Sequence, residues 1–154
     1  DARTFDWYPL FHYGFLFYHF RKDPATGAQW LLKGVPRVKD QQDEWALQNV
    51  AALWIEKGYQ TTNAAGLVEA MASDSRPGAF RNYLTVRAGR LRDLAALQSA
   101  VAMFRQRYGK DVERLDDLVS SGLIAETPKD PLGSGFGLDE SGWPILKSEA
   151  TSAK

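Results

Sequence analysis

Two histidines and one aspartate near the start of the chain have the spacing best suited to chemistry. His12 and His19 are seven residues apart, so on a helix they share a face, and Asp23 follows one turn later. Imidazole and carboxylate groups placed together bind metals or transfer protons. Aromatic residues surround both histidines, and we therefore expect core histidines with satisfied hydrogen bonds rather than a metal or acid–base site.

The remaining acidic residues have equally simple explanations. Asp116, Asp117 and Glu113 could form paired carboxylates, but consecutive acids on an amphipathic helix normally make up its solvated side. The sequence has no P-loop, HExxH, GxSxG or CxxC pattern, and its glycine-rich stretch 133–137 lacks the dinucleotide-binding spacing. We predict a protein that is not an enzyme and that has no catalytic residues, cofactor or bound metal.

Composition narrows the class of protein further. A chain of 154 residues with 44% hydrophobic residues can bury a core, as one domain or as two small packed pieces. Because cysteine is absent, disulfides, thiolate zinc sites and cysteine nucleophiles are excluded. The net charge of zero gives no attraction of the whole molecule to nucleic acid or acidic membranes.

Charge is nevertheless unevenly distributed along the chain. Basic residues dominate positions 76–110, and acidic residues dominate positions 111–140. The two segments either neutralise each other in the fold or leave a basic face for an acidic partner. A nucleic-acid binder would use that basic stripe, but we expect no nucleic-acid partner.

The chain begins at Asp1 without a signal-peptide pattern, so we expect a piece of a longer protein, with any membrane anchor lying upstream of residue 1. The uncharged stretch 7–20 is too short to span a membrane, and we predict that it is a core helix.

Periodicity and capping residues predict a mainly α fold. The expected helices are 7–20, 24–34, 43–58, 63–73 and 80–108, followed by a short helix that Asp111 caps and Gly122 ends. Asp23 should cap 24–34 and Pro36 should stop it, Gly58 should be a left-handed C-cap of 43–58, and Thr61 or Thr62 should cap 63–73. The segment 80–108 is either a single helix or two helices that bend at Gly89. A small β-hairpin or loop is expected over 136–145. The linker 73–78 divides the predicted domains, 1–75 and 76–147, and residues 148–154 are expected to form a disordered end.

The first two pairs of helices repeat a pattern of small and large residues. Four positions recur 37 residues later in the order small, aromatic, small, aliphatic: Gly14, Phe17, Gly27 and Leu31 correspond to Ala51, Trp54, Ala64 and Val68. Small residues at these positions let helices cross closely. The pattern resembles tetratricopeptide helical hairpins, although the period is three residues longer than that family's 34. Another four-helix arrangement with well-packed hairpins remains the alternative.

The tetratricopeptide resemblance implies stacked hairpins with a groove that receives a partner's extended segment or helix. Gln48 and Asn49 on the inner helices would bind the peptide backbone there, unless they are solvated helix residues. We therefore expect a protein or peptide partner, and the oligomeric state stays open.

A second resemblance covers 94–145. Its parts are the helix end at Tyr108-Gly109, a short helix with Leu115 and Leu118, and the motif Pro128-x-Asp130-Pro131-x-Gly133 before the predicted hairpin. This segment resembles the soluble part of the major pseudopilins of type II secretion systems, but it lacks the proline usual after the Tyr-Gly pair. That family's loop holds calcium; here Asp130, Asp139 and Glu140 lack an EF-hand-like spacing, and we expect turn and solvated residues.

The two resemblances together imply a non-enzymatic protein–protein interaction scaffold, a tetratricopeptide-like module of a larger bacterial envelope protein. The expected location is the bacterial periplasm or cell envelope, with the cytoplasm as the alternative. The alternative function is a structural subunit or accessory protein of a type II secretion or type IV pilus apparatus.

Overall fold

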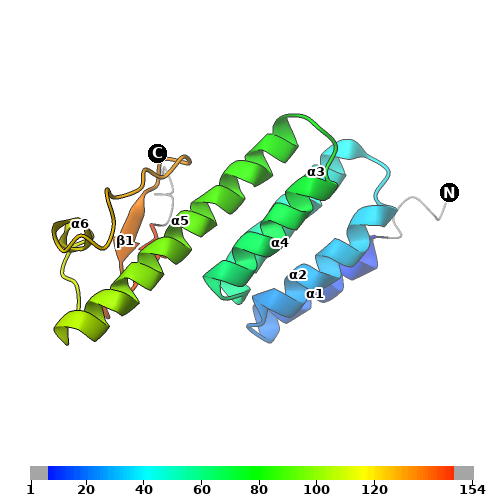
Figure 1. The fold of residues 1–154 in the computed structure, drawn as a ribbon. Helices are drawn as coiled ribbons and strands as arrows, with labels where there is room; N and C mark the ends of the chain where they lie inside the picture. Colours follow the sequence, from blue (N-terminus) through cyan, green and yellow to red (C-terminus); the bar gives the residue numbers. More distant parts are fainter. Residues whose placement is uncertain (1–6, 148–154) are drawn as a thin grey trace, which may run out of the picture. The chain divides into compact units, whose positions relative to one another are not determined.

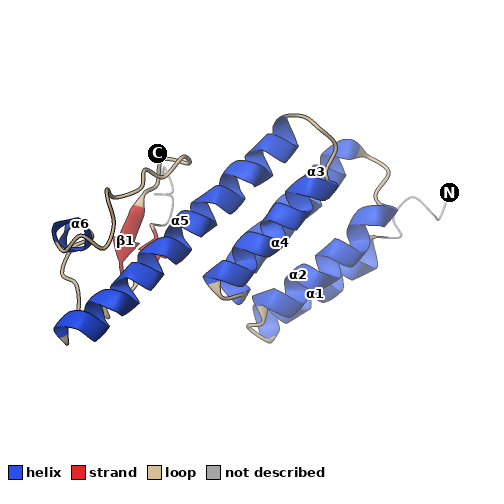
Figure 2. Ribbon diagram, viewed as in Figure 1, coloured by secondary structure: helices blue, strands red, loops and turns tan. Residues whose placement is uncertain are grey.

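The computed structural model describes residues 7–147, which form a mainly helical fold with one small antiparallel sheet (Figures 1 and 2). The predicted fold class is confirmed. The elements in chain order are α1 (Tyr8–Phe20), α2 (Pro24–Gly34), the 3₁₀ turn η1 (Val35–Arg37), α3 (Gln41–Gly58), α4 (Thr61–Asp74), α5 (Ala79–Tyr108), α6 (Asp116–Ser120), β1 (Phe136–Leu138) and β2 (Pro144–Leu146). The predicted end segment 148–154 lies outside the described residues.

Capping side chains set the starts of α2 and α3. The Asp23 carboxylate accepts a hydrogen bond from the Thr26 amide at 3.0 Å, and Pro24 occupies the first helical position. The predicted cap and bounds of α2 are therefore confirmed. Asp40 caps α3 by accepting from the amides of Gln42 and Asp43, so this helix begins two residues earlier than expected.

The first hairpin, α1 with α2, packs through two glycines. A Cβ atom added to Gly14 would lie 2.8 Å from the carbonyl oxygen of Gly27, and one added to Gly27 would lie 2.9 Å from the carbonyl oxygen of Gly14. Both distances are shorter than side chains tolerate, so only glycine permits this crossing. The predicted close approach of Gly14 and Gly27 is confirmed.

The second hairpin, α3 with α4, carries alanine at the equivalent positions. Ala51 and Ala64 are fully buried, yet α3 and α4 come close over a shorter length than α1 and α2 do. α3 instead packs closely along α2, where the Trp54 ring lies against Gly27. The extra Cβ atoms give the physical reason for the looser second crossing.

Gly58 was predicted as a left-handed C-cap, and this prediction is wrong. Gly58 is the last residue of α3 and is not among the residues with positive φ. A Cβ atom at this position would collide with the backbone of Ala25. Close packing between α3 and the start of α2 therefore requires glycine here. The predicted Thr caps of α4 are also wrong, because α4 begins at Thr61 and Gln60 is its N-cap residue.

α5 is one helix of 30 residues, which decides between the two alternatives for the segment around Gly89. Residue contacts divide the chain within this helix, after Ala88, into an N-terminal unit and a C-terminal unit. The first ten residues of α5 thus belong with α1 to α4, whereas the predicted domain boundary follows α4.

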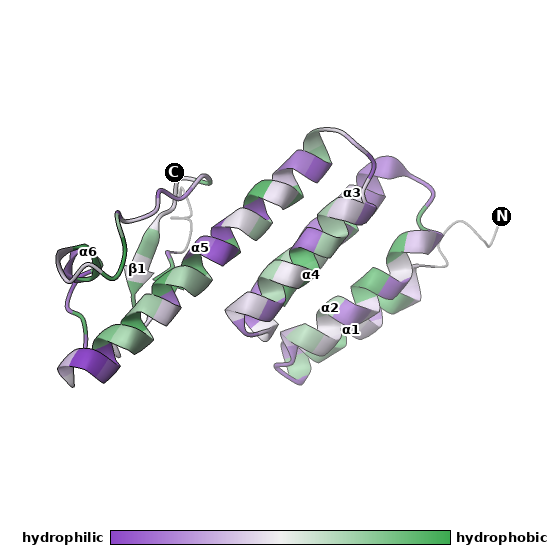
Figure 3. Cartoon of the chain, viewed as in Figure 1, coloured by the Kyte–Doolittle hydropathy of each residue, from purple (hydrophilic) through white to green (hydrophobic). Residues whose placement is uncertain are grey.

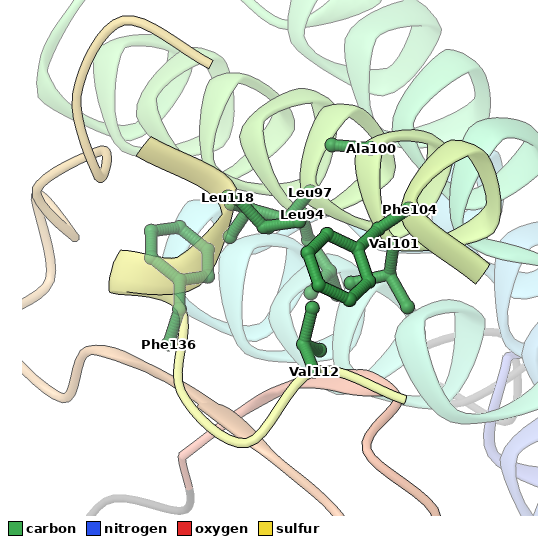
Figure 4. Packing of buried hydrophobic residues seen from close by; sticks show 8 residues of the cluster. All are labelled: Leu94, Leu97, Ala100, Val101, Phe104, Val112, Leu118 and Phe136. Carbon is green, nitrogen blue, oxygen red and sulfur yellow. The ribbon is translucent and has the colours of Figure 1, made fainter. Parts of the chain in front are cut away.

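The core of the C-terminal unit forms along the rest of α5. Hydrophobic residues follow this half of the helix, and hydrophilic residues occupy its last turn (Figure 3). Eight buried side chains make up the cluster in Figure 4: Leu94, Leu97, Ala100, Val101, Phe104, Val112, Leu118 and Phe136. Leu118 of α6 thus packs against the apolar side of α5.

A two-stranded hairpin closes the C-terminal unit. β1 and β2 are antiparallel, with Phe136 opposite Leu146 and Leu138 opposite Pro144. The Gln98 side-chain amide donates to the Pro144 carbonyl at 3.1 Å and connects α5 to β2. The predicted hairpin is confirmed.

The short helix α6 starts differently from the prediction. Asp117, not Asp111, accepts hydrogen bonds from the amides of Glu113 and Arg114 before α6, and these bonds lower the Asp117 pKa. Asp111 instead pairs with Arg105 at 2.7 Å.

The prediction of a core helix for 7–20 is also wrong. Gly14 is the only residue of α1 that is buried, and both His12 and His19 are exposed. The sequence pattern failed here because it shows how apolar a helix is but not how many neighbours it has. Among residues 7–147, α2 is the helix that runs closely along α1, and α3 reaches α1 through the stack of the Tyr18 and Trp54 rings.

Candidate functional site

The best candidate site lies on the N-terminal unit and emerges from comparing α1 with α3. At the 37-residue spacing, Tyr8, His12, Phe15 and His19 correspond to Trp45, Asn49, Ala52 and Glu56. We call the first set the α1 stripe and the second set the α3 stripe. Within each set the spacing of four, three and four residues keeps the side chains on one face of the helix.

The start of α5 contacts the α3 stripe. The rings of Trp45 and Phe80 stack with centroids 5.6 Å apart. The Tyr83 hydroxyl donates to the Asn49 side-chain carbonyl at 3.0 Å. These contacts, together with an ion pair one turn further along α5, cover the α3 stripe from Asn49 to Glu56, while Trp45 at its start stays 39% exposed.

That ion pair joins Glu56 and Arg87. The Arg87 guanidinium approaches both carboxylate oxygens, with Nε 2.5 Å from Oε1 and Nη2 2.9 Å from Oε2, and both side chains are about nine-tenths buried or more. Burial lowers the pKa of Arg87, but the Glu56 carboxylate raises this pKa by more, so the net pKa lies above the ordinary value. Arg87 is therefore held charged in a buried ion pair that contains one hydrogen bond, from Nη2 to Oε2.

No element within residues 7–147 covers the α1 stripe in this way. Tyr8 and Phe15 are 49% and 40% exposed, and His12 and His19 are exposed as well. The side chains contact one another instead: the Tyr8 and His12 rings are 4.4 Å apart, and the Phe15 and His19 rings are 4.0 Å apart. The predicted core histidines are thus surface residues within an aromatic face.

A hollow of about 130 Å³ opens beside this stripe, between the start of α1 and α3. Three aromatic side chains, three aliphatic ones and one carboxylate line this α1–α3 hollow: Trp7, Tyr8, Phe11, Asp43, Ala46, Leu47 and Val50. An apolar cavity of ~150 Å³ holds a benzene molecule. The α1–α3 hollow therefore has room for one aromatic ring or one branched aliphatic side chain.

Residue size accounts for the hollow. The 37-residue spacing relates Asp43, Ala46 and Val50 of α3 to three larger residues of α5, namely Phe80, Tyr83 and Arg87. Those larger side chains contact the α3 stripe, as described above. The equivalent residues of α3 are too short to reach α1 in the same way.

The predicted peptide-binding residues lie on the same helix but outside the hollow. Asn49 accepts the Tyr83 hydrogen bond, and Gln48 is buried with no hydrogen-bond partner for its side-chain oxygen among the described residues. Their role in binding a partner stays a prediction. Tyr8, Phe11 and Ala46 were not selected as site residues from the sequence. The signal that the sequence offered is that the small Ala46 corresponds to the larger Tyr83 at the 37-residue spacing.

Two of the three carboxylates weighed for calcium, those of Asp130 and Asp139, accept local hydrogen bonds. Asp130 accepts from the amides of Leu132 and Gly135 and pairs with Arg90 at 2.9 Å, with both side chains buried. Asp139 holds the hairpin turn by accepting from the Ser141 and Trp143 amides.

Residues 7–147 contain neither a cluster of metal-binding side chains nor a helix that could span a membrane. No group of three or more histidine or acidic side chains there is placed to hold a metal ion. No helix in this range combines the length and hydrophobicity needed to cross a bilayer.

Burial and hydrogen bonding act on Asp130 in opposite directions. Burial raises the pKa of Asp130, but the two backbone amides and the Arg90 guanidinium lower this pKa by more. The carboxylate therefore stays ionised and fixes the loop between α6 and β1.

In the C-terminal unit, a hollow of about 340 Å³ lies near the end of α5. It is lined by polar and charged residues with one aromatic ring: Phe104, Lys110, Asp111, Glu113, Asp117, Ser120 and Ser121. Because Asp111 pairs with Arg105 and Asp117 holds the start of α6, these carboxylates have structural roles.

Comparisons of the chain with known protein families, with curated proteins and with solved structures find no match. The candidate site therefore rests on the geometry of α1, α3 and α5.

Proposed function

We propose that the N-terminal unit is a non-enzymatic protein-interaction module, which binds a partner segment at the α1–α3 hollow. The observation that carries the proposal is an apolar hollow, with the rings of Trp7, Tyr8 and Phe11 at the start of α1 on one side and Ala46, Leu47 and Val50 of α3 on the other. Pockets of this kind bind one anchoring side chain of a peptide, and neighbouring contacts then set its direction.

The chemistry of the hollow defines the anchor. A phenylalanine, leucine or tryptophan side chain buries its apolar surface against the three rings, at about 25 cal/mol per Å² of surface removed from water. Asp43 is the one charged residue of the lining. A lysine or arginine next to the anchor would meet this carboxylate, so we expect partner segments with an apolar residue followed or preceded by a basic one.

A filled hollow tests this function. Ala46→Tyr introduces the residue type that α5 carries at the equivalent position, Tyr83, and Ala46 is exposed, so the larger side chain can be accommodated. A library of displayed 12-residue peptides, selected on the wild-type chain, should yield apolar anchors beside basic residues, and Ala46→Tyr should weaken their binding at least tenfold by fluorescence anisotropy.

The matched control places the same substitution elsewhere on the N-terminal unit. Ala70 is an exposed alanine of α4 and lies outside the hollow, so Ala70→Tyr should bind the selected peptides as the wild type does. Equal binding by the wild type and Ala46→Tyr would contradict the proposed function.

The wider setting of the module is also a proposal. The resemblance to tetratricopeptide hairpins and to pseudopilin tails favours a larger bacterial envelope protein, and the alternative is a structural or accessory part of a type II secretion or type IV pilus apparatus. In the C-terminal unit the chain forms, in order, a long helix, a short helix, a loop fixed by Asp130 and a small hairpin. This order supports the alternative, a part of a secretion or pilus apparatus. A two-hybrid assay of the whole chain against a major pseudopilin would test it: an interaction favours the apparatus, and its absence favours the scaffold.

A further inference from the structure

The α1 stripe lies within the most exposed apolar surface of the described residues. Twelve large hydrophobic side chains are exposed between positions 7 and 147, and five of them lie on the 13 residues of α1: Tyr8, Tyr13, Phe15, Leu16 and Phe20. Phe20 is 77% exposed. A concentration of this kind, flanked by polar residues, marks a protein-binding surface.

The order of groups along the α1 stripe reads as aromatic ring, imidazole, aromatic ring, imidazole. Tyr8 and His19 lie equally far from the midpoint of the stripe, and so do His12 and Phe15. A second α1 helix placed antiparallel on the stripe therefore brings each aromatic ring next to an imidazole of the other copy. The same combination of groups already packs within α1, with ring centroids 4.0 to 4.4 Å apart.

Charges at the two ends of the stripe fit the antiparallel direction. Asp43 lies beside Tyr8 in the α1–α3 hollow, at the start of the stripe. Arg21 and Lys22 directly follow the last residue of α1, and the Lys57 ammonium group is 3.0 Å from the Tyr18 hydroxyl near the same end. An antiparallel second copy sets the carboxylate of one chain against the cations of the other, whereas a parallel copy sets like charges together.

We infer that the α1 stripe pairs with the α1 stripe of a second copy of this chain, antiparallel and about a two-fold axis. Such an isologous contact needs a self-complementary surface, which the order of rings and the charges supply. The inference goes beyond peptide binding at the hollow. The two surfaces share Tyr8 and Asp43, whereas Ala46, Leu47 and Val50 line the hollow from α3 and lie outside the stripe.

The first test is the concentration dependence of the mass of the whole chain, measured by sedimentation equilibrium from 1 to 200 µM. The wild type should change from monomer to dimer in this range, because one helix pair is a contact of small area. Phe15→Arg places a charge at the centre of the stripe and should raise the dissociation constant roughly 30-fold or more. Met103→Arg alters an exposed apolar residue of the C-terminal unit and should leave the constant unchanged.

The second test fixes the direction of pairing and uses the absence of cysteine from the chain. A mixture of the single variants Tyr8→Cys and His19→Cys should be cross-linked by a short bismaleimide, while each variant alone should not be. In an antiparallel pair, identical positions this far from the axis are separated by about 16 Å along the helix. Cross-linking of either variant with itself would contradict the antiparallel arrangement.

Charge reversal tests the ends of the stripe. Asp43→Lys and Lys22→Glu should each weaken the dimer about threefold, and the double variant should recover most of the affinity. A chain that stays monomeric at 200 µM would overturn the inference, as would a monomer that sediments with phosphatidylglycerol vesicles through α1. Peptide binding, the proposed function, is tested independently of the dimer, because Phe15→Arg should still bind the selected peptides in the hollow and Ala46→Tyr should not.

Discussion

The two equivalent helix faces of the N-terminal unit differ in whether the next helix contacts them. On α3, the stripe of Trp45, Asn49, Ala52 and Glu56 meets Phe80, Tyr83 and Arg87 of α5 through a ring stack, a hydrogen bond and an ion pair. On α1, the equivalent stripe stays exposed, and a hollow separates its start from α3. A repeated helical pattern thus sets where the helices lie, and the size of the facing residues decides whether a contact closes or remains open for a partner.

Breaking the closed contact should have the largest effect. Arg87→Leu leaves the buried Glu56 carboxylate without its partner and should cost about 3 kcal/mol in the free energy of unfolding, measured by urea denaturation. Glu56→Leu combined with Arg87→Leu should recover most of that loss, because two apolar residues need no partner. His19 is the α1 equivalent of Glu56, and His19→Leu should change stability by less than about 0.5 kcal/mol. A large loss at His19 would show that the α1 stripe is not open.

The two hairpins allow a second comparison, through their glycines. Gly14→Ala places a Cβ atom 2.8 Å from the Gly27 carbonyl and should destabilise the chain by about 2 kcal/mol, because backbone must move. Gly66 lies inside α4 with no neighbouring atom within 4 Å. The same change at Gly66 should therefore stabilise by ~1 kcal/mol, since alanine favours a helix over glycine. Thermal unfolding of both variants measures these opposite signs, and a shift of the same sign in both would contradict the close α1–α2 crossing.

The smallest effect we expect depends on pH and is confined to the C-terminal unit. Asp130 has a lowered pKa when folded, so the stability it contributes is complete above the unfolded value of about 3.9 and is lost as the pH falls toward the folded value. The wild-type β-hairpin resonances should therefore weaken below about pH 4, as followed by NMR, while those of α1 to α4 change less. Asp130→Asn removes one titrating group, and its hairpin resonances should keep only the weaker pH dependence that the lowered pKa of Asp139 supplies. Parallel titration curves for the wild type and Asp130→Asn would exclude Asp130 as the cause.

Local signals made most of the fold predictable. Asp23 and Pro24 give the start of α2, the apolar stripe gives α5, and Gly122 with φ of +73° ends the α6 turn as its residue type predicts. The repeated small residues predicted the crossing of α1 with α2, because two helices cross closely only where both carry small residues at the contact.

The candidate site was less predictable, for reasons that depend on neighbours in space. The sequence of an aromatic helix predicts a core helix whether or not other helices cover it. For this reason His12 and His19 were expected to be buried. The hollow results from Ala46 and Val50 being smaller than Tyr83 and Arg87 at equivalent positions. Such a difference becomes meaningful only when the start of α5 is known to pack on α3.

Hydroxyl-radical footprinting of the chain at 1 µM, read residue by residue by mass spectrometry and corrected for intrinsic reactivity, tests the open and closed faces most directly. We expect strong labelling of Tyr8, His12 and Phe15 and weak labelling of Tyr83 and Arg87. The selected peptide should protect Tyr8, and a higher chain concentration should protect Tyr8, His12 and Phe15. Equal labelling of the two faces in dilute solution, or an α1 stripe already protected there, would contradict the account.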